Sequence, residues 1–180
     1  MTDLNPVVII AGPTASGKSA LALDVAGEFS GTVINADSMQ VYEDLSVLTV
    51  RPGKAEKAAV PHRLFGVLPA SEGCSAGRWL KMAAGEIEAA WVDGRLPVMV
   101  GGTGLYLKVL TEGLAEIPDI ADEFNEQAND LYDRIGGEAF KAELAKLEPV
   151  AAISLPAGDS QRLKRAMTVV RATGRALADW

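Results

Sequence analysis

The segment Gly12–Ser19 reads GPTASGKS and constrains the chain more than any other part of it. Its glycines let the backbone curl so that successive N–H groups point inward, a geometry that binds phosphate oxygens. Lys18 adds a positive charge, and Ser19 adds a hydroxyl that can bind Mg²⁺. A plain glycine turn is the alternative. We expect a di- or triphosphate site, with Ser19 as its metal ligand, formed by Gly12, Pro13, Thr14, Ala15, Ser16, Gly17, Lys18 and Ser19.

The residues on either side of this segment have the order that a phosphate-binding loop requires. Val7–Ala11 is an unbroken apolar run, typical of a strand buried on both faces. After the loop, Leu21, Val25 and Phe29 recur every four residues with Ala22 and Ala26 beside them, and together they predict a helix whose apolar stripe packs on a sheet. Strand, loop and helix together predict an α/β fold, a P-loop NTPase-like parallel sheet flanked by helices.

Length and composition exclude several other classes of protein. The 180 residues suit one domain, or one domain and part of another. We expect a soluble cytoplasmic protein, because no apolar run is long enough to span a membrane and residues 1–3 do not begin a targeting segment. Cys74 and His62 are the only residues of their types, which excludes an intrachain disulfide and a Cys/His zinc cluster. A net charge of −7 means that any RNA partner needs a local basic patch.

Asp37 is the first candidate for catalysis. Thr32–Ala36 predicts a second buried strand, and Asp37 and Ser38 follow directly at its carboxyl end, where open parallel sheets bind ligands. A carboxylate there can bind Mg²⁺ through water or accept a proton from a nucleophile. The alternative is an Asx turn or helix cap that opens the segment Met39–Tyr42.

Two more strands are predicted before residue 105. Leu64–Leu68 indicates a third strand, and a long helix capped by Ser75 and ended by Gly94 follows it. Pro97–Val100 predicts another buried strand, which runs into the glycine-rich turn Gly101–Gly104. Such a turn permits close approach of a ligand to the backbone, or is simple punctuation. No strand other than the one ending at Asp37 offers the acid that holds Mg²⁺ in an NTPase, which favours phosphate chemistry other than hydrolysis.

The chain changes character after residue 116. We predict a P-loop α/β core over 1–116 and a helical module over 117–180. One helix of the module is expected to stop at Gly136, and a loop through Pro149 and Pro156 is expected to lead to a last helix capped by Asp159.

The last helix concentrates positive charge in an otherwise acidic chain. A solvated helix surface is one explanation, and contact with RNA phosphates and base edges is the other. The polar residues of its first turns are Gln161, Arg162, Lys164 and Arg165.

Four segments together resemble one family, the tRNA dimethylallyltransferases, also called tRNA isopentenyltransferases. They are Gly12–Ser19, NADSMQVY at Asn35–Tyr42, GGTGLY at Gly101–Tyr106, and QRLKRA at Gln161–Ala166, the last followed by ATGRALADW. The first segment marks a large superfamily, whereas the second and third are specific. The resemblance extends over essentially the whole chain.

The resemblance implies transfer of a dimethylallyl group from dimethylallyl diphosphate to the exocyclic N6 amine of the adenosine 3′ to the tRNA anticodon. Diphosphate and Mg²⁺ would be bound at the loop, and no ATP would be hydrolysed. By resemblance Asp37 is the general base and Thr103 positions the adenine, while Ser38, Met39 and Gln40 line its pocket. The helical module would bind the anticodon stem-loop of a tRNA, and the complete protein would be a monomer. The tRNA contacts carried over are Gln161, Arg162, Leu163, Lys164 and Arg165.

The chain also departs from the family. Members usually continue beyond the QRLKRA segment and return to the core, so we expect that returning segment to be absent here and transfer to be slow. Asn125 stands about where the family often has an arginine near the tRNA. Three alternatives are a small-molecule P-loop kinase that uses ATP, an enzyme that prenylates free adenine nucleotides, and a non-catalytic tRNA-binding remnant.

Overall fold

The computed structural model describes residues 5–45, 49 and 51–180, and residues 1–3, considered above for a targeting segment, lie outside that range. The chain divides into two compact units, 1–114 and 115–180. In the first unit, all the described strands pair in parallel in the order β1-β4-β2-β3. Its strands and helices are β1 (Val8–Ala11), α1 (Lys18–Glu28), β2 (Gly31–Asn35), a 3₁₀ turn (Glu43–Leu45), α2 (Lys54–Ala59), β3 (His62–Arg63), α3 (Ala76–Val92), β4 (Leu96–Gly101) and α4 (Gly104–Glu112).

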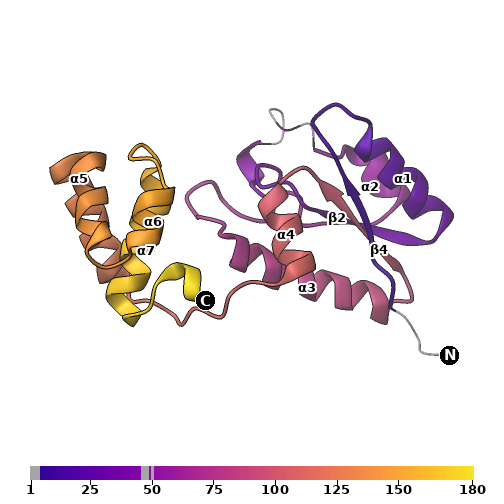
Figure 1. Cartoon of the computed structure of the whole chain (residues 1–180). Helices are drawn as coiled ribbons and strands as arrows, with labels where there is room; N and C mark the ends of the chain where they lie inside the picture. The colour runs from indigo at the N-terminus through magenta and orange to yellow at the C-terminus, as the bar shows by residue number, and fades with distance from the viewer. Residues whose placement is uncertain (1–4, 46–48, 50) are drawn as a thin grey trace. The chain divides into compact units, whose positions relative to one another are not determined.

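The two central strands are buried on both faces because helices cover the sheet on both sides (Figure 1). Alternate residues of a strand point to opposite faces. Val33 and Val98 accordingly pack in one apolar cluster with residues of α1. Ile34 and Met99 pack in the other cluster, with residues of α3 and α4. This arrangement confirms the predicted α/β sheet flanked by helices.

The predicted apolar stripe of the first helix is correct at Ala22, Val25 and Ala26, which pack in the apolar cluster, and wrong at Leu21 and Phe29. Leu21 is 52% exposed and Phe29 is 63% exposed, whereas Ala22 and Ala26 are buried against the sheet. The methyl side chains of the two alanines let the helix axis come close to β2 and β4, and this directs the larger side chains outward. Spacing alone did not distinguish the two stripes, because both repeat every four residues.

The predicted strand at Leu64–Leu68 is also wrong. β3 contains only His62 and Arg63, which pair with Val33 and Ile34. The next residue, Leu64, has a φ of 62°, a left-handed conformation that ends the extended run. Leu68 retains one isolated parallel bridge, to Tyr42.

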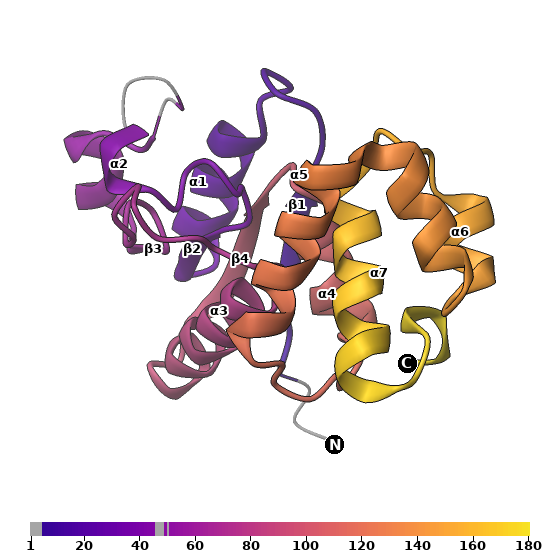
Figure 2. The same ribbon diagram turned by 90° about the vertical axis from the view of Figure 1, so that its left-hand side faces the viewer.

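The second unit is helical (Figure 2). Gly136, with φ 75° and ψ 167°, breaks α5 at the predicted position. The predicted loop between Pro149 and Pro156 instead contains the short helix α6, which has proline in its first turn. Phe140, Leu144 and Leu163 form the core of the unit. Its elements are α5 (Asp122–Ala145), α6 (Pro149–Ser154), α7 (Ser160–Thr173) and a 3₁₀ turn (Leu177–Asp179).

Among the residues that the structure describes, none of the helices combines the length and the apolar character that a membrane crossing needs.

His62 on β3 should make stability depend on pH. Its Nδ1 lies 2.9 Å from the carbonyl oxygen of Val60, and burial, the largest influence, lowers the pKa of the ring. The unfolded chain therefore binds a proton that the folded chain resists, so stability is lost as pH falls below about 6.5, the unfolded pKa. We expect His62→Gln to flatten this loss, as measured by urea unfolding between about pH 7.5 and pH 5.5. An unchanged slope would contradict the assignment, because the chain has no other histidine.

Candidate active site

The loop between β1 and α1 has the backbone conformation of a phosphate cradle. Ala15 and Gly17 have φ values of 63° and 84°, and α1 begins at Lys18. The first N–H groups of a helix have no partners within the helix and carry partial positive charge. Lys18 donates from Nζ to the carbonyl oxygen of Pro13, which folds its side chain back over the loop. Backbone dipoles and an ammonium group thus converge on one small volume.

This loop and the segment after β2 line one cavity of about 550 Å³. The sequence-predicted residues in its wall are Thr14, Ala15, Ser16, Gly17, Lys18, Ser19, Asp37, Met39 and Gln40. Its wall does not include Gly12, Pro13, Ser38 or Thr103. The loop and the segment after β2 share one cavity because β1, β4 and β2 pair in parallel, so the carboxyl ends of these strands lie at the same edge of the sheet.

Asp37 lies just after β2, in a turn closed by a hydrogen bond to its own side chain. Its Oδ1 accepts a hydrogen bond of 2.8 Å from the backbone N–H of Met39. This is the Asx-type bond that the sequence offered as the alternative to a catalytic role. Since Asp37 also lines the cavity, the two interpretations are compatible.

The glycine-rich turn after β4 holds the same segment from its other side. Thr103 donates its N–H to the Ala36 carbonyl oxygen at 3.3 Å, and its Oγ1 accepts from the Ser38 N–H at 2.9 Å. A third bond, 3.3 Å long, joins the hydroxyl groups of Thr103 and Ser38. Thr103 therefore contacts the backbone beside Asp37, and its hydroxyl is already used there.

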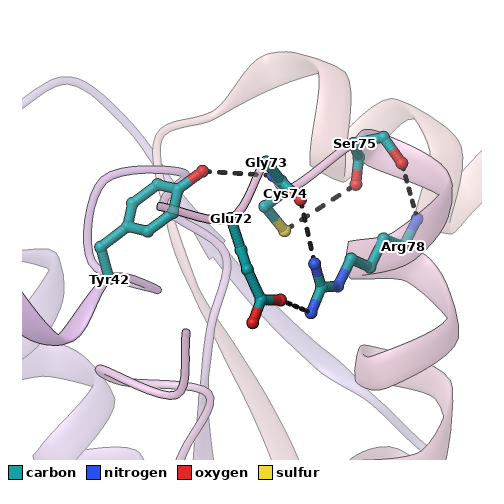
Figure 3. Close-up of polar contacts among 6 residues, drawn as sticks. All are labelled: Tyr42, Glu72, Gly73, Cys74, Ser75 and Arg78. Carbon is teal, nitrogen blue, oxygen red and sulfur yellow. Dashed lines mark hydrogen bonds and ion pairs between the residues drawn. The ribbon is translucent and has the colours of Figure 1, made fainter. Parts of the chain in front are cut away.

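The far end of the segment is anchored to the start of α3 (Figure 3). The Tyr42 hydroxyl accepts a bond of 3.2 Å from the Cys74 N–H. Arg78 binds the loop that precedes α3, because it donates to the Gly73 carbonyl oxygen at 3.1 Å and to the Glu72 carboxylate. Ser75 caps α3, as predicted, by accepting from the Arg78 N–H.

The core behind the site contains an aromatic pair. The rings of Trp79 and Tyr106 are stacked, with centroids 4.3 Å apart and planes 9° from parallel. Burial raises the pKa of Tyr106, whose hydroxyl donates to the Cys74 carbonyl oxygen. Trp79 donates from Nε1 to the Asn35 carbonyl oxygen at 3.0 Å. The pair therefore supports the end of β2 that leads to Asp37.

The described residues hold no cluster of three or more His, Cys, Asp or Glu side chains that would bind a metal by itself. The cavity wall contains the Ser19 hydroxyl and the Asp37 carboxylate, two oxygen donors of the kind that Mg²⁺ binds. A Mg²⁺ site needs only one or two protein ligands when substrate phosphates and waters complete its coordination.

The predicted RNA-contacting residues in the second unit differ in accessibility. Gln161, Arg162, Arg165 and, on α5, Asn125 are exposed. Leu163 is fully buried in the helical core, so its side chain is removed from the predicted RNA surface.

Lys164 is only partly available for RNA. Its side chain is 23% exposed and its Nζ lies 3.5 Å from Asp133 Oδ1. The same Nζ lies 4.8 Å from the centre of the Tyr132 ring. Asp133 and Tyr132 lie on another helix, so the sequence around Lys164 gave no signal of these partners.

Sequence reasoning missed five residues of the site. Asn35 holds the backbone around Asp37, and Ala20, Thr49, Phe65 and Val100 line the cavity. A polar residue at the end of a buried apolar strand was the available signal for Asn35. Thr49 and Phe65 lie in irregular segments and had no such signal.

Gly101 should be essential for the approach of β2 to β4. A Cβ atom built at this position would collide with backbone atoms of Ala36, which cannot rotate away as a side chain can. We expect Gly101→Ala to reduce the free energy of unfolding by about 1–3 kcal/mol, measured by urea unfolding. Gly104→Ala, three residues on and with open space around its Cβ, is the matched control and should be neutral or stabilising. Equal effects of the two substitutions would contradict the close approach.

Two family profiles together match nearly the whole chain. The IPP transferase profile matches residues 40–180 and the isopentenyl transferase profile matches residues 5–65. The chain is 55% identical over 175 residues to a tRNA dimethylallyltransferase of Rhodospirillum rubrum, covering 97% of this chain and 54% of that protein. It is 54% identical over 180 residues to the tRNA dimethylallyltransferase of Rhodospirillum centenum, covering all of this chain and 57% of that protein. The chain thus spans about half the length of the curated relatives it matches.

Two solved structures are similar. One is a eukaryotic dimethylallyltransferase acting on tRNA, with a TM-score of 0.83 and 29% identity over 96% of this chain and 43% of that one. The other is the tRNA isopentenylpyrophosphate transferase of Bacillus halodurans, with a TM-score of 0.60 and 31% identity over 95% of this chain and 57% of that one. Since the IPP transferase profile matches well over half of its residues, the chain belongs to the IPP transferase family.

Proposed function

We propose that this chain transfers a dimethylallyl group from dimethylallyl diphosphate to the N6 amine of the adenosine 3′ to the anticodon of tRNA, releasing diphosphate. The observation that carries the proposal is the single cavity whose wall contains both the phosphate-binding loop and Asp37. A donor diphosphate bound by the loop would have its reactive carbon beside a carboxylate. The relatives named above, which are tRNA dimethylallyltransferases, support the same activity.

The reaction follows from these groups. The N6 nitrogen attacks the first carbon of the dimethylallyl group, the carbon–oxygen bond breaks, and its electron pair leaves with the diphosphate. The loop N–H groups and Lys18 stabilise the negative charge that develops on the leaving oxygens. The proton lost from the amine passes to Asp37, the general base. Both products are accounted for without ATP.

Mg²⁺ is the metal ion that these residues suit. The Ser19 hydroxyl, and the Asp37 carboxylate through water, would hold it against the donor phosphates. When bound, the ion would neutralise charge on the leaving diphosphate.

The target adenine has to leave its stack to enter the cavity. Met39 and Phe65 offer apolar surface in the wall, and Gln40 offers a side-chain amide that can bind a base edge. We assign Thr103 a positioning role, because its hydroxyl contacts the Ser38 backbone and side chain. The loop and Asp37 come from one chain, so the proposed chemistry needs only a monomer, acting in the cytoplasm with its tRNA.

The proposed tRNA surface lies on the second unit. Gln161, Arg162 and Arg165 are exposed over the first turns of α7, and Asn125 is exposed on α5. Arginine and glutamine side chains suit phosphates and unpaired base edges of an anticodon stem-loop.

Asp37→Asn should abolish most transfer while leaving the fold intact. The amide keeps an oxygen for the Met39 N–H but cannot accept the proton, so we expect a loss of about 10²–10⁴-fold in kcat. The assay measures label transferred from dimethylallyl diphosphate to unmodified tRNA in the presence of Mg²⁺. Asp24→Asn on the exposed side of α1 makes the same chemical change away from the cavity and should retain activity.

Either of two results would contradict the proposal. One is equal transfer by the parent and Asp37→Asn. The other is ATP turnover by a parent that transfers no label, which would favour the kinase alternative.

Arg162→Gln and Arg165→Gln should each weaken tRNA binding. Each removes one exposed cation from the proposed surface, so the slope of log affinity against log salt should decrease by about one unit. Arg134→Gln, an exposed position on α5 outside the proposed surface, causes the same change in net charge and is the control. Filter binding at several salt concentrations measures both quantities. If all three substitutions act alike, only net charge matters and the surface is assigned wrongly.

A further inference from the structure

We propose that Asn35 is a positioning residue that fixes the backbone of Asp37, so that one carboxylate oxygen is held by Met39 and the other is left for the proton transfer. This inference rests on the function proposed above. It concerns a residue that does not line the cavity and acts only through another one.

The side-chain amide of Asn35 forms hydrogen bonds with both the N–H and the carbonyl group of Asp37. Its Oδ1 accepts from the Asp37 N–H at 2.9 Å, and its Nδ2 donates to the Asp37 carbonyl oxygen at 2.9 Å. The same Nδ2 donates to the Leu64 carbonyl oxygen at 3.0 Å. The partners are backbone groups with fixed roles, one donor and two acceptors, so only one orientation of the amide satisfies all three.

Asn35 is completely buried at the end of its strand, directly after the apolar residues Val33 and Ile34. A buried amide is costly unless it is hydrogen-bonded, and an aliphatic side chain would suit a central strand better. Two of its three bonds go to Asp37, the residue that the proposed reaction uses as base. A purely structural strand end would not need both bonds to one residue.

The hydrogen bonds from Asn35 to the Asp37 backbone also affect the Asp37 carboxylate. With the backbone of Asp37 fixed, its Oδ1 is within 2.8 Å of the Met39 N–H. Within the described part of the chain, Oδ2 makes no hydrogen bond to protein, while Asp37 lines the cavity. One oxygen is therefore used for orientation and the other can accept a proton.

Asn35 also connects two walls of the cavity. Leu64, its third partner, has a left-handed φ of 62°, and the next residue, Phe65, lines the cavity. The Asn35 carbonyl oxygen in turn accepts from Trp79 Nε1 at 3.0 Å. Loss of the amide would free both the backbone of Asp37 and the backbone that leads into Phe65.

The test compares Asn35→Leu and Asn35→Asp with Thr32→Val in this chain. Leucine removes all three bonds, and aspartate directs an oxygen at two carbonyl oxygens. Thr32, buried on the same strand, accepts from Arg95 Nε at 3.1 Å, so valine there also deletes a buried hydrogen bond but far from Asp37. Two readouts are measured for each variant: kcat and KM for label transfer, and the protection of the Met39 amide from hydrogen exchange, which reports its bond to Asp37 Oδ1.

We expect both Asn35 variants to lower kcat by about 10- to 100-fold with little change in KM for dimethylallyl diphosphate. The Met39 amide should lose its protection from hydrogen exchange in both Asn35 variants. Thr32→Val should lower stability alone. The inference is overturned if the Asn35 variants behave like Thr32→Val, with the Met39 protection and kcat retained. If the parent transfers no label, the proposed function fails for this chain, and the Met39 protection by itself still decides whether Asn35 fixes Asp37.

Discussion

The site depends on how closely β2 and β4 approach at their carboxyl ends. Asn35 pairs with Val100, so the next residue of each strand, Ala36 and Gly101, face each other where no Cβ fits on the glycine. This contact brings Thr103 within hydrogen-bonding distance of Ala36 and Ser38. The pairing of β1 with β4 then brings the phosphate-binding loop to the same edge. A wider separation of the strands would leave the loop and Asp37 without a common cavity.

Buried polar groups then convert this edge from a packed surface into an ordered site. Asn35, Thr103 and Tyr42 each bond to backbone or loop atoms around the segment that carries Asp37. Each of these bonds satisfies a polar group that burial would otherwise penalise. The segment is thereby held at its beginning, its middle and its end. Such preorganisation is what a general base needs, because small misplacements of reacting groups reduce rates strongly.

The helical unit has a different physical character. Its core residues are held by side-chain packing, while its arginines remain at the surface with weak, exposed partners such as Asp159. Exposed ion pairs contribute little to stability, so these cations can exchange partners for phosphates at small cost. Lys164 differs because it lies over the Tyr132 ring and near Asp133 within the unit.

The sequence by itself determined the parallel α/β sheet, the phosphate-binding loop, the position of Asp37 after a buried strand and the helix break at Gly136. These features follow from local composition: apolar runs, glycines and caps act over a few residues. Only the tertiary structure decided that Leu21 and Phe29 lie outside the helix face that packs on the sheet, that β3 ends at Arg63, and that Asn35 binds the backbone of Asp37. The reason is that each of these depends on a partner distant in sequence, such as β4 or the backbone at Leu64, whose position no local pattern encodes.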